Sequence, residues 1–305
     1  MIYTVTFNPS IDYILRTPPL QEGEVNRAVG EEMRLGGKGI NVSVILSRLG
    51  VETVALGFSA GFIGDALIEM VRQEGVDSDF IPLQEGNTRI NVKLWGDGGK
   101  VTEINAGGPV IDDRAMESFY RKISRLTGED TLVLAGSVPA SLPVDIYRQI
   151  LERISDHGVR TVVDATGDLL LGVLAYRPFL IKPNRSELAE VVGRALPDDR
   201  AIEEAARELQ NKGARNVLVS LGGDGALLLD EDGQVHRVQS ACRQVRYTVG
   251  AGDSMVAGFL AGVDRGYEYA LRLGSAAGGA TAGSEGLATR AEIEALMAEF
   301  DPMNV

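Results

Sequence analysis

The chain has few of the residues that crosslink proteins or bind transition metals. Among its 305 residues there is one cysteine, Cys242, which excludes an internal disulfide and a metal site built from several thiolates. The two histidines, His157 and His236, fall in no spacing typical of metal ligands. The sequence therefore shows no sign of a disulfide framework or of a cysteine or histidine metal site.

Positive charge is also scarce. The chain has 30 lysines and arginines against 43 acidic residues, a net charge of −13 at pH 7. No basic run is interleaved with aromatic residues, so we expect no nucleic-acid partner. In so acidic a protein, an anionic substrate has to be met by a local group of lysines and arginines.

Long apolar runs and common nucleotide motifs are missing as well. No run approaches the roughly 20 apolar residues of a membrane span, and the N-terminus resembles a strand rather than a secretory signal. We expect a cytoplasmic protein that does not bind membranes. No G-x-G-x-x-G occurs and no lysine stands in P-loop spacing, which weakens a nicotinamide, flavin or P-loop interpretation.

What is present is a regular alternation of short apolar runs with amphipathic helical patterns. The runs that predict strands are 2–7, 53–58, 131–135, 160–164, 179–182 and 217–221, followed by a hairpin of 226–230 and 234–238. Nearly continuous apolar strands between helices predict an α/β fold with a mostly parallel sheet that is covered on both faces. We expect one domain, 1–305, with ligands at the carboxyl ends of the strands.

Two stretches interrupt this alternation. Residues 11–34 are polar and contain Pro18 and Pro19, and residues 88–104 alternate like a strand pair around a turn at 96–99. We expect both to form a small β lid. Alternation directs Arg89, Asn91 and Lys93 to one face, where they would receive an anionic substrate or simply face solvent.

The most informative segment is Tyr247-Thr248-Val249-Gly250-Ala251-Gly252-Asp253. Small residues at a helix start expose N–H groups that bind an anion, and Asp253 follows in the first turn. This arrangement suits phosphoryl transfer: Gly250, Ala251 and Gly252 hold the migrating group while Asp253 removes a proton from a hydroxyl. The alternative is a glycine loop in which Asp253 only stabilises the helix start.

Further candidate residues follow other predicted strands. Gly36-Gly37-Lys38-Gly39-Ile40-Asn41 opens a helix, and Lys38 adds a point charge suited to phosphate; a tight turn is the alternative. Asp12, after the first strand, would accept hydrogen bonds from sugar hydroxyls or form an Asx turn. Ser137, after the strand at 131–135, would donate to a phosphate.

A nucleotide site is expected on the other half of the chain. Asn184 and Glu187 stand three residues apart, which suits a hydrated Mg²⁺, although helix-start stabilisation by Glu187 competes with this interpretation. The segment Ser220, Leu221, Gly222, Gly223, Asp224 and Gly225 either lies along a nucleotide or turns into the next strand.

These motifs together resemble the PfkB (ribokinase-like) sugar kinases. The runs GGKGIN, KPNRSE and TVGAGDS occur in the family's order, and the similarity covers essentially the whole chain. The resemblance implies a ribokinase-like three-layer α/β/α sandwich with a β lid, ATP with Mg²⁺ as phosphoryl donor and a sugar phosphate as acceptor. NPSID, EVNR, TRINVK and TVGAGDSMVAG resemble the branch that phosphorylates fructose 1-phosphate at its C6 hydroxyl, with tagatose 6-phosphate as the alternative acceptor.

The resemblance also implies roles for individual residues. Asp253 is expected as the base, with the N–H groups of 250–253 as the anion hole. The residues implied around the sugar phosphate are Asp12, Arg27, Gly37, Lys38, Asn41, Arg89, Asn91 and Ser137. Those implied for ATP are Lys182, Asn184, Ser220 to Gly225 and Gly252, with Glu187 for the metal, through water.

Tyr247 departs from the wider family, where Asp or Asn is common at this position. Any metal or monovalent-cation contact from here is therefore open. Lids of this family often pair between subunits, and exposed strand edges need covering, so we expect a homodimer through the lid. A non-catalytic sugar-phosphate sensor and a dehydrogenase are the rival functions.

Overall fold

The computed structural model describes residues 1–96 and 101–300. The strands are β1 (Ile2–Thr6), β2 (Ser10–Arg16), β3 (Gly30–Gly36), β4 (Thr53–Ala60), β5 (Asp77–Ser78), β6 (Ile81–Leu83), β7 (Arg89–Trp95), β8 (Val101–Asn105), β9 (Thr131–Ala135), β10 (Arg160–Asp164), β11 (Leu180–Ile181), β12 (Asn216–Ser220), β13 (Ala226–Leu229) and β14 (Val235–Val238). Every strand predicted from the sequence is present, and most boundaries differ by one or two residues.

Helices fill most of the connections between these strands. The α-helices are α1 (Lys38–Arg48), α2 (Gly61–Gln73), α3 (Asp113–Ile123), α4 (Ile146–Arg153), α5 (Gly167–Leu171), α6 (Arg185–Val192), α7 (Asp199–Asn211), α8 (Ala251–Gly262), α9 (Tyr267–Gly283) and α10 (Arg290–Ala298). The short 3-10 helices are η2 (Ser155–His157), η3 (Leu174–Tyr176), η4 (Gly222–Asp224) and η5 (Val263–Arg265). Within the described residues, none of the helices is long and apolar enough to cross a membrane.

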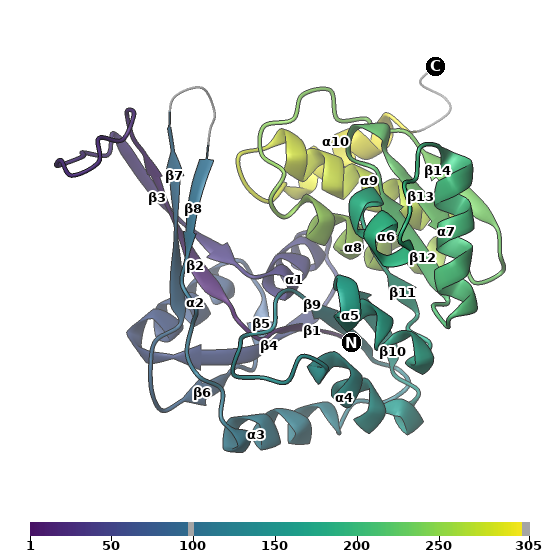
Figure 1. The fold of residues 1–305 in the computed structure, drawn as a ribbon, viewed down its shortest axis with the longest axis horizontal. Coiled ribbons are helices and arrows are strands. Elements are labelled where there is room, and N and C mark those ends of the chain that lie inside the picture. The colour runs from purple at the N-terminus through teal and green to yellow at the C-terminus, as the bar shows by residue number, and fades with distance from the viewer. Residues whose placement is uncertain (97–100, 301–305) are drawn as a thin grey trace.

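The main sheet has the order β14-β13-β12-β11-β10-β9-β1-β4-β5, with β6 also paired to β4 (Figure 1). From β12 through β5 neighbouring strands are parallel, whereas β12, β13 and β14 pair antiparallel as the predicted late hairpin. This mixture confirms the mostly parallel sheet. It also places the carboxyl ends of β1, β9, β10 and β12 along one edge.

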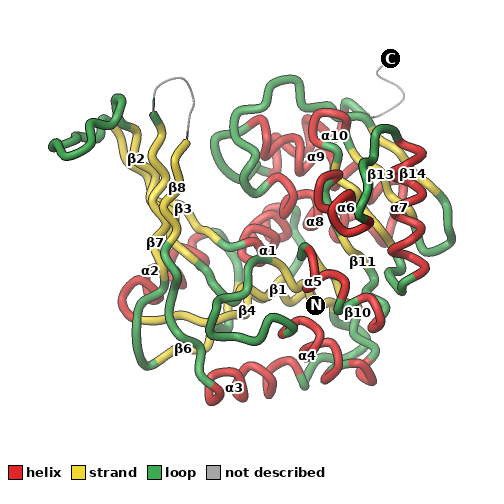
Figure 2. Tube along the Cα trace, in the orientation of Figure 1, coloured by secondary structure: helices red, strands yellow, loops and turns green. Residues whose placement is uncertain are grey.

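Helices cover both faces of this sheet, which gives the expected three layers (Figure 2). Strand β9 shows why: Leu132 and Leu134 pack into the apolar cluster of α3, α4 and α7, while Val133 and Ala135 pack into that of α1, α8 and α9. Because successive side chains of a strand point to opposite faces, a strand that is apolar throughout requires cover on both sides.

The lid is a separate four-stranded sheet of order β3-β2-β7-β8 within the described residues. It stands beside the main body in Figure 1 and confirms the lid predicted at 11–34 and 88–104, although its strands extend slightly beyond those bounds. Residues 97–99 of the predicted turn lie outside the described part of the chain. Register places Tyr13 between Met33 and Val92, and Val92 beside Ile104, so an apolar row crosses one face of the lid.

Candidate active site

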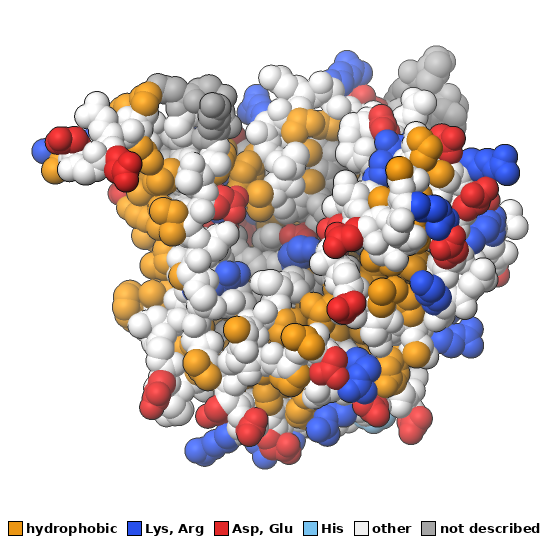
Figure 3. All heavy atoms as spheres, viewed as in Figure 1, with side chains coloured by type: hydrophobic (Ala, Val, Ile, Leu, Met, Phe, Trp, Pro, Cys, Tyr) orange, Lys and Arg blue, Asp and Glu red, His pale blue; other side chains and the backbone are white. Residues whose placement is uncertain are grey.

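A cavity of about 610 Å³ lies where the carboxyl ends of the main strands face the lid. Figure 3 shows the hollow between the two, with charged side chains around it. The walls contain both glycine loops, the inner face of the lid and the ends of β1, β10 and β12. The sequence motifs, scattered over the whole chain, therefore meet in one place.

The second glycine loop forms the start of α8. Gly250 has φ +83°, and a Cβ there would lie 2.7 Å from Cδ2 of Leu287. At Gly252 a Cβ would lie 3.1 Å from Nζ of Lys182, so a side chain there would press on that ammonium group. The N–H groups of Gly252 and Asp253 lie in the first turn of α8, where no carbonyl of a preceding helical turn accepts their hydrogen bonds. The anion-hole prediction requires this arrangement.

Asp253 is 5% exposed and lines the cavity. Its Oδ2 accepts a hydrogen bond of 2.8 Å from Nδ2 of Asn41, which lies on α1. Burial, followed by the negative charge of Asp164, raises the pKa of Asp253 to about 6, while Asn41 and the lysines work against that rise. A carboxyl group with a pKa just below neutrality is suited to act as a general base.

Asp164, the last residue of β10, holds two lysines in the cavity. It is 2% exposed; its Oδ2 lies 3.3 Å from Nζ of Lys38 and its Oδ1 lies 3.4 Å from Nζ of Lys182. Burial opposes its ionisation, but the charges of Lys182 and Lys38 outweigh burial and keep its pKa below the ordinary value. Both lysines are thus fixed close to Asp253 and the α8 start.

Sequence reasoning missed Asp164. It identified the strand at 160–164 but gave its last residue no role. The available signal was position: an acid at the carboxyl end of a buried parallel strand lies at the edge where ligands collect.

The lid contributes a second polar cluster around Asp12. Oδ1 of Asp12 accepts hydrogen bonds from Oγ of Ser10 at 2.8 Å and from Nδ2 of Asn91 at 3.0 Å. Its Oδ2 lies 3.3 Å from Nζ of Lys93, a 4% exposed residue that also pairs with Glu103 at 3.1 Å. The expected alternation of β7 is therefore realised, with Lys93 supporting Asp12.

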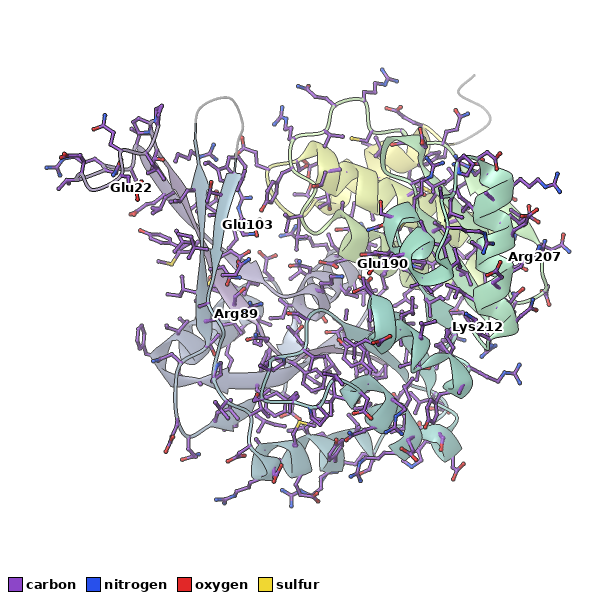
Figure 4. The ribbon with its side chains drawn as sticks, in the orientation of Figure 1. Glu22, Arg89, Glu103, Glu190, Arg207 and Lys212 are labelled. Carbon is purple, nitrogen blue, oxygen red and sulfur yellow. The ribbon has the colours of Figure 1, made fainter. Side chains whose placement is uncertain are left out.

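Arg89 and Glu103 lie on the lid strands in Figure 4. Arg89 donates from Nε and Nη2 to the backbone carbonyl of Asn8, at 3.1 and 2.9 Å, and it lines the cavity. Burial lowers the pKa of Arg89, which nevertheless remains a cation under ordinary conditions.

Most of the predicted site residues line this one cavity: Asp12, Gly37, Lys38, Asn41, Arg89, Asn91, Ser137, Lys182, Asn184, Glu187, Ser220, Gly250, Gly252 and Asp253. Some do not. Arg27 is exposed in the loop between β2 and β3, and Ala251 belongs to α8 without lining the cavity. Leu221 is buried beside the core, and Gly222, Gly223, Asp224 and Gly225 form the turn into β13, which was the competing interpretation.

Asn184 and Glu187 form a capping box at the start of α6. Oδ1 of Asn184 accepts from the N–H of Glu187, and Oε2 of Glu187 accepts from the N–H of Asn184, both at 2.8 Å. This is the helix-start role that competed with metal binding. Both side chains still line the cavity, so the two roles are compatible.

Comparison with known proteins agrees with this geometry. The family description "pfkB family carbohydrate kinase" matches residues 5–294. The chain belongs to the pfkB family of carbohydrate kinases. It is 43% identical to a 1-phosphofructokinase of Bacillus subtilis, over 98% of each chain, and 36% identical to a D-tagatose-1-phosphate kinase of Bacillus licheniformis, over 94% of each.

Solved structures share the pfkB fold. Phosphofructokinase-2 from Escherichia coli in complex with fructose-6-phosphate is 28% identical, with a TM-score of 0.90 over 98% of each chain. Ribokinase from Arabidopsis thaliana is 21% identical, with a TM-score of 0.79 over 97% of this chain and 98% of that chain, which shows the fold alone. The ribokinase-like fold expected from the sequence is therefore confirmed.

Tyr247, which stands where Asp or Asn is common in the wider family, packs against the lid. Its ring centroid lies 5.3 Å from that of Trp95 and 6.0 Å from Nζ of Lys93. Burial raises the pKa of Tyr247, although the charge of Lys93 works against this. The residue that precedes the α8 loop is thus in contact with the lid in this pfkB kinase.

Proposed function

We propose that this pfkB kinase is an ATP-dependent 1-phosphofructokinase, a single domain with an attached lid. It transfers the γ-phosphoryl group of ATP to the C6 hydroxyl of fructose 1-phosphate, giving fructose 1,6-bisphosphate and ADP. The observation that carries the proposal is the position of Asp253, buried in the cavity wall between the α8 donor loop, two lysines and the lid. The relatives named 1-phosphofructokinase support the choice of acceptor.

Asp253 acts as the base in this reaction. The proton of the C6 hydroxyl passes to its carboxylate as the C6 oxygen bonds to the γ-phosphorus and the bond to the β–γ bridging oxygen breaks, releasing ADP. The N–H groups of 250–253 and the two lysines held by Asp164 stabilise charge on the transferring group.

The acceptor lies between the α1 loop and the lid. Asp12, Asn91 and Asn41 provide carboxylate and amide groups for sugar hydroxyls, and Arg89 and Ser137 provide donors for the 1-phosphate. Lys38, held by Asp164 near Asp253, contacts the acceptor at its reacting C6 end. Arg27 remains a candidate for the same phosphate, but it is exposed on the loop between β2 and β3 and does not line this cavity.

ATP occupies the other half of the cavity, along Lys182, Asn184, Ser220 and Gly252. The donor set there fits Mg²⁺, since Asp164 and Glu187 present carboxylate groups to the same wall, with Oδ1 of Asp164 also 3.4 Å from Nζ of Lys182. Among the described residues, no three His, Cys, Asp or Glu side chains form a metal cage. Mg²⁺ usually keeps several waters, so Glu187 would hold the ion through water. The ion, when bound, neutralises phosphate charge.

The lid also supports a proposal about assembly in the cytoplasm. Met33 and Ile104, at the two ends of the apolar row on the lid, are 59% and 58% exposed, and the row lies on the face away from Asp12. A second lid covers this face in a homodimer.

Light scattering tests the homodimer. Phosphofructokinase-2 from E. coli has a tetrameric inhibited form, so the measurement has to distinguish a dimer from a tetramer. A monomeric mass at micromolar concentration contradicts pairing through the lid.

The acceptor is tested by kcat/KM on purified fructose 1-phosphate, tagatose 1-phosphate, tagatose 6-phosphate and fructose 6-phosphate. We expect fructose 1-phosphate to give the highest value. Tagatose 1-phosphate is the second candidate because of the B. licheniformis relative, whereas the comparisons do not favour tagatose 6-phosphate. A higher kcat/KM on another sugar overturns the choice of acceptor. If no sugar leads to ADP release, the result supports the rival function of a non-catalytic sugar-phosphate sensor. An absorbance change that depends on a nicotinamide cofactor supports the other rival function, a dehydrogenase.

A further inference from the structure

Three arginines meet at the edge of the main sheet opposite the catalytic cavity. Arg160 is the first residue of β10, Arg215 immediately precedes β12, and Arg177 follows η3 just before β11. Because β10, β11 and β12 are parallel neighbours, these residues meet at one end of the strands. They line a second cavity of about 230 Å³, which shares no residue with the catalytic one.

Phe179 fixes two of the guanidinium groups. Its ring centroid lies 4.7 Å from Cζ of Arg160 and 5.2 Å from Cζ of Arg215, and the ring itself is 4% exposed. Cation–π contacts of this kind are favourable and directional. They hold two positive charges close together, which favours the binding of an anion.

Only part of the counter-charge to these groups is supplied by the protein. Arg215 pairs with Glu231, with 2.5 Å between Nη2 and Oε2. The charge of Arg160 also acts on Glu231, but within residues 1–96 and 101–300 neither Arg160 nor Arg177 forms a direct ion pair, and both are exposed. The cavity therefore carries more positive than negative charge, in a chain whose net charge is −13.

Arg177 is placed at this edge by the end of η3. Its backbone is left-handed, with φ 52° and ψ 56°, and it is the one non-glycine residue with positive φ in the described part of the chain. A left-handed residue commonly ends a helix, and here it turns the chain from η3 toward β11.

We propose that this cavity binds a phosphate group, either free phosphate or the phosphate of a small monoester. The planar guanidinium donates paired hydrogen bonds that match phosphate oxygens, and the cavity has room for such an anion. Thr161 and Tyr176 line the same cavity. The site is separate from phosphoryl transfer, since β10 runs from Arg160 here to Asp164 in the catalytic cavity.

Isothermal titration with inorganic phosphate at constant ionic strength tests the proposal. We compare the unmodified protein with Arg160→Gln/Arg177→Gln and with a charge-matched control, Arg200→Gln/Arg243→Gln. The control side chains are 88% and 86% exposed in surface ion pairs. We expect the unmodified protein and the control to show a binding component that is at least tenfold weaker in the Arg160/Arg177 variant. All three proteins keep the catalytic cavity, so phosphate binding there does not contribute to the differences between their isotherms.

An unchanged kcat/KM for the kinase reaction verifies that the variant is folded. If the double variant is unstable, Arg177→Gln alone, in an exposed turn, serves the same purpose. Glycerol 3-phosphate distinguishes the source: tighter binding than inorganic phosphate indicates a monoester ligand, and equal or weaker binding indicates the free anion. Identical phosphate isotherms for all three proteins overturn the proposal.

Discussion

Asn41 donates a hydrogen bond of 2.8 Å from Nδ2 to Oδ2 of Asp253, across 212 residues of sequence. The contact joins the helix that follows the first glycine loop to the helix that follows the second. It fixes the orientation of the carboxylate and stabilises its ionised form, because the amide lowers the pKa that burial raises.

Replacing Asn41 with alanine removes that stabilisation. We expect the acid limb of the kcat/KM profile for fructose 1-phosphate to move to higher pH, with a loss of roughly tenfold at pH 7. The control is Ser43→Ala on the same helix, since Ser43 is buried and bonds Thr4 and Thr53 outside the cavity. Equal pH profiles for the Asn41 variant and the control would show that the amide does not influence the base.

The raised pKa of Asp253 has consequences for both activity and stability. Activity falls as the pH drops through about 6, because the base becomes protonated. The pKa of Asp253 in the folded state exceeds the unfolded value of 3.8, so the folded protein binds the carboxyl proton more tightly than the unfolded chain does. Ionised Asp253 therefore lowers the free energy of unfolding, and this loss grows as the pH rises from about 4 to above 6.

Asp253→Asn should therefore stabilise the protein while removing activity. At pH 8 the gain in unfolding free energy is expected to be on the order of 3 kcal/mol, and it should be smaller at pH 5. Urea unfolding at both pH values measures it, with Asp264→Asn, an exposed acid after α8, as control. A stability difference that does not grow with pH is incompatible with a raised pKa.

Asp164→Asn removes the charge that holds Lys38 and Lys182. We expect KM for ATP to rise about tenfold or more, because the lysines lose their anchor. The acid limb of kcat/KM should also move to lower pH, since the negative charge of Asp164 helps to raise the pKa of Asp253. Asp168→Asn, at the exposed start of α5, is the matched control. An unmoved acid limb would mean that Asp164 acts only on the lysines.

Lys93→Met tests the support of Asp12. The substitution leaves a buried carboxylate without its cation, which should weaken acceptor binding and destabilise the lid. We expect KM for fructose 1-phosphate to rise about tenfold, with a smaller change in KM for ATP. The surface variant Lys122→Met, which loses only its pair with Asp79, should leave both KM values unchanged. Equal changes in the two KM values would contradict a specific role at Asp12.

The sequence predicted the parts of this site that depend on local pattern. Apolar runs predicted the strands of the main sheet, and small residues before Asp253 predicted the start of α8. Both predictions succeed because backbone conformation and the spacing of apolar residues depend on residues that are neighbours in the sequence. The polar face of β7 followed from alternation alone, and structure adds that Lys93 lies behind Asp12.

Other features depend on distant contacts and were not predictable. Asp164 gains its importance from Lys38 and Lys182, which reach it from other strands and helices. Gly222 and Gly223 form the turn between β12 and β13, and their place along a nucleotide stays a prediction, because glycines serve both roles with the same sequence pattern. Placement of Arg27 depends on a lid loop whose direction no local pattern specifies.

The most direct test of phosphoryl transfer by this site is the turnover of Asp253→Ala with ATP and fructose 1-phosphate. A general base contributes about 10²–10⁴-fold, so kcat should fall by that factor while the variant remains folded. Near-wild-type turnover in a folded Asp253→Ala protein would contradict the account.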